Sequence, residues 1–407
     1  MANFMSDMIS NLGDVLYYLA LISYVSKLDK SNMDIAISII TISEMLPTFI
    51  AFITGSIADK TKNKINGILL TLIIRTILYI LIAFVMGFKP ELWIVIFVSF
   101  INFVSDIIGL YENGMHSYVS KYLVNDEDRE SAMAFSASAS ETLDIVFQTI
   151  GAILITIVSY RILALINAGT FIFSAIIILI IKSDLLKILP KTKEDISEEE
   201  ENLSLKEMFY ELIDSIKYLT SLDEIRSTII SLPIVNGITS IIQMLIVLIM
   251  AENPKMIIIS TEFTISILLL LITIGSILGG FFTINLFKNL KIKILMSILA
   301  LISVITLVSI LIGNIYLTLV SIFLSSLIEG VLNPKMGSVI MNNIPEGKIG
   351  TIMGGMVTYF SLGDFVSSTL FSILVIIISA QNILILYLLV STATFIYTIF
   401  NKKNIKI

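Results

Sequence analysis

Apolar residues fill this chain in about twelve long stretches, and one sizeable polar segment, residues 182–226, divides the stretches into two groups. A bilayer core ~30 Å thick takes about 20 apolar residues per helical crossing, and stretches such as 257–287 and 294–312 meet or approach that length. Lipid offers the backbone no hydrogen bonds, so each crossing must be a helix or part of a closed barrel. Barrel strands alternate apolar and polar residues, whereas these stretches are continuously apolar. The pattern therefore predicts an all-α, polytopic membrane protein.

The apolar pattern predicts about six crossings on each side of the polar segment. We expect the first group at 9–28, 33–57, 65–88, 91–113, 134–158 and 161–181. We expect the second group at 226–250, 259–287, 292–313, 315–341, 350–379 and 383–400. The chain is thus predicted to hold an N-terminal half (1–181), a cytoplasmic acidic linker (182–226) and a C-terminal half (227–407).

The linker contains two kinds of sequence. Residues 194–201 are mostly acidic and indicate a solvated, flexible run. Residues 204–219 place apolar side chains at helical spacing opposite a charged face, and Ser204 followed by Glu207 makes a capping box. We expect an amphipathic helix on the inner membrane surface, serving as a strap between the two halves.

The distribution of lysine and arginine predicts the orientation, because short cytoplasmic loops carry an excess of both. With the N-terminus inside, twelve basic residues fall in cytoplasmic segments, seven in the linker and only five outside. Both termini and the linker are therefore expected in the cytoplasm. The first residues lack the basic flank and cleavage site of a signal peptide, so we expect the first helix to be retained as an anchor.

The composition supports a membrane protein and excludes sites that need cysteine or several histidines. The chain is 56% hydrophobic and 14% charged, with a mean hydropathy of +0.97 and a net charge of −6. It has no cysteine and a single histidine, His116, so disulfides, thiol catalysis and histidine metal clusters are excluded and no cofactor is expected. The acidic balance gives no reason to expect nucleic acid as a partner. Richness in Ile and Lys indicates a bacterial source and hence the plasma membrane.

An internal repeat supports two related halves. Residues 124–144 match 344–364 without a gap at an offset of 220 residues. Asp126 then meets Glu346, and Asp144 meets Asp364. The match pairs the loop and helix after crossing four with the loop and helix after crossing ten, as a duplication of six helices predicts.

The loop between crossings two and three reads GSIADKTKNK over residues 55–64. It resembles the cytoplasmic loop signature of the major facilitator superfamily, and the matching positions are Gly55, Ala58, Asp59, Lys60 and Lys64. Lys62 and Asn63 depart from that signature. In physical terms, Gly55 would allow helices to approach closely and Asp59 could cap the N-terminus of a neighbouring helix.

Further segments are similar to the macrolide-efflux branch of that superfamily, a group of drug:proton antiporters. These segments are 12–14 in crossing one, 123–128 after crossing four, 222–226 at the end of the linker and 274–280 in crossing eight. Two features of many drug antiporters are absent: an arginine in crossing four, where Ser105 and Asp106 stand, and a Gly-Pro pair in crossing five. The resemblance implies the two-half fold, a small-molecule substrate and coupling to protons, in a protein expected to be a monomer.

Ionisable side chains inside crossings call for a role, because one near the bilayer centre costs at least about 2.5–3.5 kcal/mol. The candidates for proton coupling or substrate binding are Asp14, Glu44, Arg75, Asp106, Glu141, Asp144, Glu329 and Asp364. We expect Arg75 to pair with one of the carboxylates, and Pro47 to loosen the helix that carries Glu44. Another three, Glu112, Glu262 and Lys335, are expected to reach water from helix ends.

These features favour a secondary transporter that exports an amphipathic or cationic compound in exchange for protons, by rocking two halves about a midplane site. A dedicated exporter of an endogenous peptide, siderophore or lipid fits the same pattern. An intramembrane enzyme is disfavoured, because no Tyr-Asp pair and no Gly-x-Gly-Asp, His-Glu-x-x-His or Gly-x-Ser-x-Gly motif occurs. A channel is disfavoured because no ring of repeated pore-lining motifs occurs.

Overall fold

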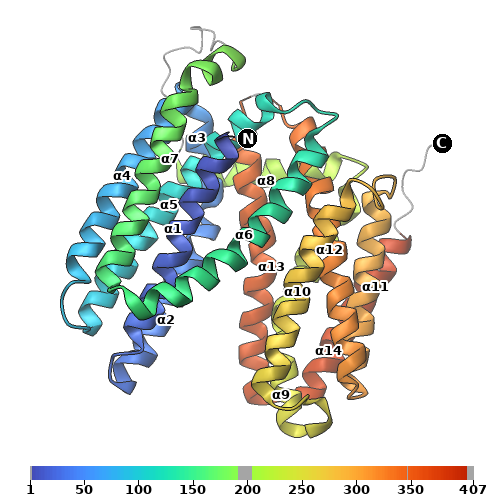
Figure 1. Ribbon diagram of the computed structural model, residues 1–407. Coiled ribbons are helices and arrows are strands. Elements are labelled where there is room, and N and C mark those ends of the chain that lie inside the picture. Colours follow the sequence, from blue (N-terminus) through green and yellow to red (C-terminus); the bar gives the residue numbers. More distant parts are fainter. Residues whose placement is uncertain (1, 191–203, 346, 401–407) are drawn as a thin grey trace. The chain divides into compact units, whose positions relative to one another are not determined.

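The structure, a computed structural model, describes residues 2–190, 204–345 and 347–400, so the acidic run at 194–201 and Glu346 of the repeat lie outside it. The described residues form fourteen α-helices and one short 3-10 helix, without a strand (Figure 1). Eleven helices are long and apolar enough to cross a membrane, and one bent pair counts as a twelfth span. The predicted fold class, all-α with about twelve crossings, is confirmed.

The contacts between residues divide the chain into two compact units. Unit 1 comprises Met1–Asn125, Thr142–Ser215 and Ile344–Thr358, and unit 2 comprises Asp126–Glu141, Ile216–Asn343 and Tyr359–Ile407. Two long helices, α6 (Arg129–Ile157) and α13 (Ile349–Ile377), therefore divide between the units. The first part of α6 belongs to unit 2, whereas the first part of α13 belongs to unit 1.

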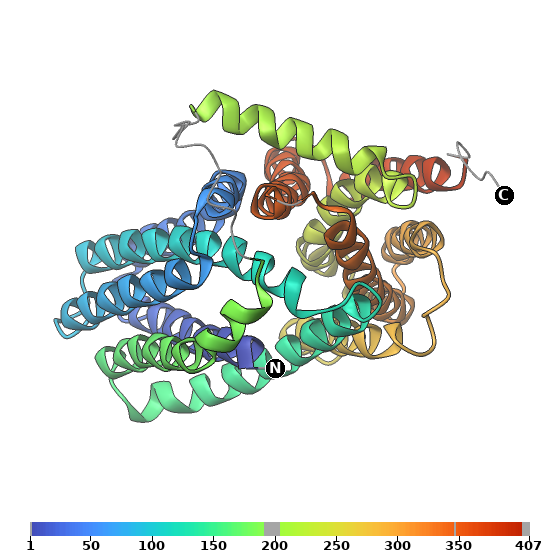
Figure 2. The same ribbon diagram turned by 90° about the horizontal axis from the view of Figure 1, so that it is seen from above.

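Unit 1 is a bundle in which α7 packs on both α1 and α4, and α5 packs on α2, α3 and α4 (Figures 1 and 2). Large side chains such as Tyr17, Tyr79 and Phe171 are buried at its centre. Its helices are α1 (Ala2–Val25), α2 (Lys30–Phe49), α3 (Ala51–Lys60), α4 (Lys64–Val85), α5 (Leu92–Leu123) and α7 (Tyr160–Ile188).

Unit 2 is built around α12, which packs on α10 and α11, while α14 packs on α9 and α11. Gly279 of α10 shows how closely α10 and α12 approach, because a Cβ there would lie 2.1 Å from the Leu327 carbonyl oxygen. Small residues permit such contacts between membrane helices. The elements are α9 (Arg226–Glu252), the 3-10 helix η1 (Pro254–Met256), α10 (Thr261–Thr283), α11 (Ile292–Leu311), α12 (Ile315–Asn343) and α14 (Ala380–Phe400).

The predicted crossings and the observed helices agree closely except at crossings one, two, four and six. Crossing one was predicted to begin at 9, but α1 begins at Ala2, and crossing six was predicted to end at 181, but α7 continues to Ile188. Crossing two is not one continuous helix, because it breaks at Ile50 into α2 and α3, which meet at 47°. The break follows Pro47, whose carbonyl oxygen accepts a bond from the Ile50 amide instead of continuing the α-helical pattern. Crossing four was predicted to end at 113, but α5 continues to Leu123 as a polar extension.

Helix boundaries agree with the predicted repeat. Helices α6 and α13 each contain 29 residues, and both their first and their last residues are separated by 220 positions. The preceding helices, α5 and α12, end at Leu123 and Asn343, which have the same separation. The following helices, α7 and α14, begin at Tyr160 and Ala380, again with that separation. Three successive helices thus keep the register of the sequence match.

The linker helix is present as α8 (Leu205–Ser221). Its capping box forms as predicted: the Ser204 hydroxyl accepts from the Glu207 amide at 3.3 Å, and the Glu207 carboxylate accepts from the Ser204 amide at 2.6 Å. The Ser204 amide and the Ser204 hydroxyl both donate to the Glu207 carboxylate, and these two bonds lower the pKa of Glu207 below its ordinary value. Within unit 1, Ser56 donates to Glu211 at 2.8 Å, and Leu212 is buried. The apolar face of α8 therefore packs partly on protein.

Candidate functional site

An arginine–carboxylate pair stands at the centre of unit 1. Arg75 of α4 bonds Asp14 of α1 at 2.9 Å between Nη2 and Oδ2, so the predicted pairing of Arg75 is confirmed. Arg75 also donates from Nε to the Ser105 hydroxyl at 3.1 Å, and its guanidinium lies over the Phe171 ring at 4.1 Å from the centroid. Asn167 of α7 donates to the other Asp14 oxygen at 3.2 Å. These bonds fix Asp14 in one orientation.

A second polar group in unit 1 contains two of the predicted carboxylates. The side-chain amide of Asn102 on α5 donates both to Glu44 of α2, at 3.0 Å, and to Asp106 of α5, at 2.9 Å. The amide oxygen of Asn102 accepts from the Tyr79 hydroxyl at 2.6 Å. Glu44 is exposed, Asp106 is partly exposed and Asn102 is buried. The amide therefore holds two carboxylates close together without neutralising either charge.

Asp144 lies apart from these two groups, on the portion of α6 that belongs to unit 1. Its Oδ1 accepts from the Asn11 side chain of α1 at 2.6 Å. Asn11 precedes Asp14 by almost one helical turn, so α1 takes part in both the Asp144 contact and the Arg75 pair. One oxygen of Asp144 is therefore bonded to a neighbouring helix of unit 1.

The remaining predicted carboxylates gather in unit 2. Glu329 of α12 interacts electrostatically with Asp364 of α13 and with Glu141 of α6. Glu141 accepts a hydrogen bond from Ser276 of α10. Glu329 Oε1 is buried and has no hydrogen-bond partner. Within the described part of the chain, no lysine or arginine forms an ion pair with Glu329 or Asp364, so this group differs from the Arg75 cluster.

The loop motif makes the contacts predicted for it, all inside unit 1. The Asp59 carboxylate accepts from the backbone amides of Gly350 and Thr351, each at 2.7 Å, and caps the start of α13. A Cβ on Gly55 would lie 2.0 Å from the Gly350 carbonyl oxygen, so this approach requires glycine. Lys64 is buried and donates to three carbonyl oxygens at the end of α3, at 2.6–2.7 Å. Each charge thus meets the helix end of opposite polarity. Lys60 is exposed.

Two residues expected to reach water from helix ends are buried instead. Glu112 lies well inside α5 because that helix is longer than predicted, and its carboxylate is 3.6 Å from the His116 ring. Lys335 on α12 donates to Glu130 at 2.7 Å and to the Lys288 carbonyl oxygen at 2.9 Å. Protein partners therefore replace water for Lys335, whereas Glu112 has one oxygen near His116 and the other, Oε2, buried without a hydrogen-bond partner. Glu262, in the first turn of α10, is exposed as expected.

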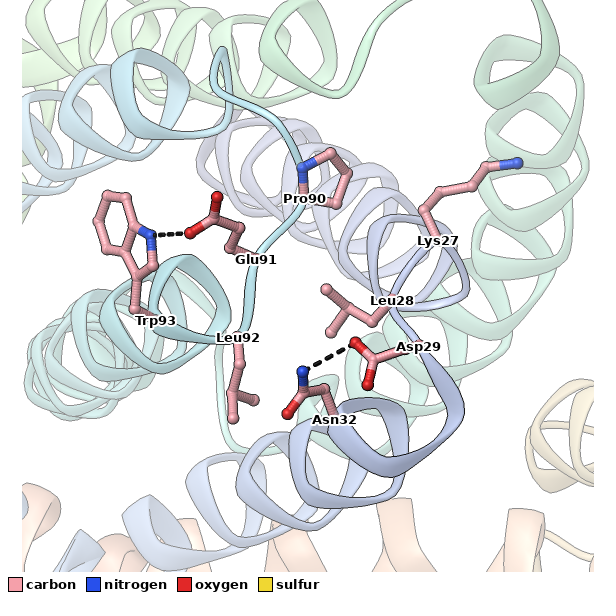
Figure 3. A pocket seen from close by; sticks show the side chains of 8 residues that line it. All are labelled: Lys27, Leu28, Asp29, Asn32, Pro90, Glu91, Leu92 and Trp93. Atoms are coloured by element: carbon pink, nitrogen blue, oxygen red, sulfur yellow. Dashed lines mark hydrogen bonds between the residues drawn. The ribbon is translucent and has the colours of Figure 1, made fainter.

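A hollow of about 490 Å³ lies at the α1–α2 and α4–α5 connections of unit 1, on the side predicted to face outward (Figure 3). Its polar side chains bond one another: Trp93 donates to Glu91, and Asn32 donates to Asp29, both at 2.8 Å. None of the predicted site residues lines it. The hollow is therefore a feature of the outer loops rather than part of the carboxylate groups described above.

Several residues of these groups were absent from the sequence-based candidates. Asn102 and Asn167 are buried amides in otherwise apolar helices, and that pattern could have identified them. Tyr17 and Tyr79 could not have been distinguished from core aromatics, because their environment depends on neighbours distant in sequence. Asp7 lay before the predicted start of crossing one, but α1 includes it, and it interacts electrostatically with His116 and Glu112.

Family and structural comparisons agree with this architecture. The model of the Major Facilitator Superfamily matches residues 2–368. The chain belongs to the major facilitator superfamily. Among curated proteins, none matches the sequence significantly.

Solved structures of this superfamily are similar over the whole chain. The human organic anion transporter MFSD10 (TETRAN) has a TM-score of 0.70 at 13% identity, covering 98% of both chains. A bacterial homologue of the iron transporter ferroportin, in its outward-facing state, has a TM-score of 0.70 at 12% identity, also covering 98% of both. The E. coli fucose:proton symporter FucP has a TM-score of 0.60 at 13% identity, covering 97% of this chain and 98% of that one.

At identities this low, the structural similarity establishes the shared fold alone. The family match identifies the chain as a multi-pass membrane transporter. The expectation of a transporter rather than an enzyme agrees with that family.

Proposed function

We propose that this superfamily member is a secondary active transporter that exports amphipathic or cationic, macrolide-like compounds in exchange for protons. The observation that carries the proposal is the carboxylate group of unit 2. Glu329 lies near Asp364 and Glu141, and one of its oxygens is buried without a partner. Burial and mutual repulsion both oppose keeping such carboxylates ionised. Protons or a positively charged ligand would relieve the repulsion, and exchanging one for the other is antiport.

The charge balance of unit 1 supports the same proposal. Arg75 bonds Asp14 directly, but Glu44 and Asp106 share only the neutral amide of Asn102. We propose Asp14, Glu44, Arg75, Asp106, Glu141, Asp144, Glu329 and Asp364 as the residues that bind protons or substrate. The contacts of the loop motif suit a conformational role in alternating access. The motif consists of Gly55, Asp59 and Lys64, which make these contacts, and of Lys60, which is exposed.

We also propose that the transporter acts as a monomer in a bacterial plasma membrane, with both termini in the cytoplasm. The two halves, 1–181 and 227–407, would move about the midplane while the linker joins them. The repeated register of α5–α7 and α12–α14 supports this arrangement.

Transport by everted vesicles tests the proposal. The full-length protein, expressed in a host that lacks its main drug exporters, should drive uptake of erythromycin when the lumen is made acidic. Glu329→Gln should lower that uptake about tenfold, the rate change of a barrier raised by about 1.4 kcal/mol. Glu262→Gln, an exposed carboxylate, should leave it unchanged.

Uptake that persists after an ionophore collapses the pH gradient would rule out proton coupling. Failure to move any compound of a drug panel, together with loss of a secreted metabolite from a deletion strain, would instead favour the dedicated exporter of an endogenous peptide, siderophore or lipid.

A further inference from the structure

A polar group in unit 1 belongs neither to the loop motif nor to the Arg75 pair. It consists of Glu44, Asn102 and Asp106 together with two tyrosines, Tyr17 and Tyr79. The Tyr79 hydroxyl donates to Asn102, which in turn donates to both carboxylates. The Tyr17 ring meets the Tyr79 ring edge to face, at 4.9 Å between centroids. All five side chains come from helices of unit 1, namely α1, α2, α4 and α5.

The positive charge that acts on this group, Arg75, already has other partners. Arg75 bonds Asp14 and Ser105 and stacks on Phe171. Its field reaches Asp106, yet among the described residues neither Asp106 nor Glu44 forms an ion pair. Asn102 orients the carboxylates but contributes no charge. The group therefore contains two carboxyl groups without a paired cation, held in a fixed geometry.

Tyr17 supplies an independent indication of a ligand. Its side chain is only 2% exposed, and its hydroxyl has no hydrogen-bond partner. That hydroxyl interacts electrostatically with Glu44, Asp106 and Asp14, and its ring packs on Tyr79, whose own hydroxyl donates to Asn102 of the same group. Buried hydroxyls nearly always have a partner. An orphaned hydroxyl beside two carboxylates indicates a place for a further polar group.

We propose that Glu44, Asp106 and Tyr17 bind the protonated amine of the transported compound. An ammonium group can donate to both carboxylates and to the Tyr17 oxygen, and its charge is attracted by aromatic faces such as those of Tyr17 and Tyr79. Because Glu44 is exposed, the ammonium group can reach the site from that side. Asn102 is buried and fixes the distance between the carboxylates. Among the described residues, no cluster of three acidic or histidine side chains suits a metal ion, which favours an organic cation.

This proposal rests on the proposed export of cationic compounds and assigns the substrate's charged group to a specific set of residues. A matched pair of fluorescent probes tests it on the purified full-length protein in detergent. The first probe is monodansyl-1,6-diaminohexane, which carries a free amine. The second is its N-acetyl derivative, which has the same ring and chain without the charge.

The amine probe should bind about tenfold more tightly than the acetylated probe, a difference of about 1.4 kcal/mol. Glu44→Gln and Asp106→Asn should each remove most of that preference, and Tyr17→Phe should reduce it about threefold. The acetylated probe should bind all variants alike. Asp106→Glu, which keeps the charge, should retain the preference for the amine.

Matched controls separate binding from folding. Glu262→Gln and Tyr316→Phe change exposed residues of unit 2 and should bind both probes as the wild type does. Every variant is first checked by gel filtration and thermal unfolding. Equal affinity of the wild type for the two probes would overturn the proposal, as would wild-type amine affinity in both Glu44→Gln and Asp106→Asn. If the group binds only protons, the two probes will bind alike, which also overturns it.

No gradient is applied in this measurement, so the two proposals fail separately. Amine binding that depends on Glu44 and Asp106 would survive a finding that transport is not driven by protons. Proton-driven export without amine preference would leave the proposed function intact and remove this site.

Discussion

Asp14 of unit 1 and Glu329 of unit 2 have opposite surroundings. In unit 1 the Asp14 carboxylate is bonded by an arginine and an asparagine, which hold it in place. In unit 2 Glu329 has only acidic neighbours among its charged contacts, and one of its oxygens lacks a partner. A paired charge contributes to a fixed structure, whereas an unpaired one requires a proton or a cation from outside. Asp14 is therefore held in a fixed position, whereas Glu329 would be stabilised by a proton or a cation.

The repeat-related aspartates show the same contrast. Asp144 and Asp364 occupy equivalent positions on α6 and α13, which start and end 220 residues apart. Asp144 accepts from Asn11 of α1, whereas Asp364 lies near Glu329 of α12. Positions related by the 220-residue repeat therefore have different surroundings.

The largest expected effect comes from removing the arginine of unit 1. Arg75→Met leaves Asp14 without its cationic partner, and breaking such a pair costs about 3–5 kcal/mol when it is fully buried. Because the Asp14 side chain is 34% exposed, we expect a loss of about 3 kcal/mol or less. Thermal unfolding in detergent measures this. Arg161→Met, at an exposed position, is the control.

The double variant Arg75→Met with Asp14→Asn sharpens the result. It removes both charges, so it should recover most of the lost stability without recovering transport. If the single variant unfolds at the wild-type temperature, the pair is not the stabilising centre of unit 1.

Neutralising Glu329 should have the opposite effect on stability. Glu329→Gln removes a poorly compensated carboxylate, so the unfolding temperature should stay the same or rise while proton-driven uptake falls about tenfold. Asp14→Asn leaves Arg75 without its anionic partner, so it should instead lower the unfolding temperature. Equal destabilisation by the two substitutions would show that Asp14 and Glu329 do not differ as described.

Removing the cap of α13 should have a smaller effect. Asp59→Ala deprives the Gly350 and Thr351 amides of their acceptor, and losing a helix cap costs about 1 kcal/mol. Hydrogen exchange at those two amides should accelerate about fivefold, as that free energy implies. Lys62→Ala in the same loop, at an exposed position, should leave both amides protected. Unchanged exchange in Asp59→Ala would show that the cap adds nothing to α13.

The smallest effect is expected at the linker helix. Ser204→Ala removes half of the capping box, so the first turn of α8 should exchange its amide hydrogens faster, as mass spectrometry of that segment can measure. Bonds from Ser204 lower the pKa of Glu207 from its ordinary 4.5. The bond to ionised Glu207 thus stabilises α8 above pH 4.5, and this stabilisation is lost as the pH falls through the lowered pKa.

Glu207→Gln should abolish that pH dependence. If the hydrogen-exchange protection of α8 does not change with pH in the wild type, the bond between Ser204 and ionised Glu207 does not stabilise the helix.

Helix positions followed closely from the sequence, because lipid requires continuous apolar helices and leaves few alternatives. The linker helix, the capping box and the Asp59 cap were also predictable, since each depends on a short motif. The break at Ile50 was only partly predictable: Pro47 indicated a weak point, but not its angle. Glu112 and Lys335 were placed wrongly, because hydropathy does not reveal a polar extension of α5 or an ion pair with Glu130.

By itself, the sequence determined the helical membrane fold, its repeat and the set of charges that need an explanation. It did so because the cost of exposing backbone or charge to lipid acts at every position, whatever its neighbours. Only the tertiary structure decided which charges are paired. Arg75 meets Asp14 across 61 residues, and Asn102 reaches Glu44 across 58. Such partners are set by how helices pack, and that packing depends on side chains from the whole bundle at once.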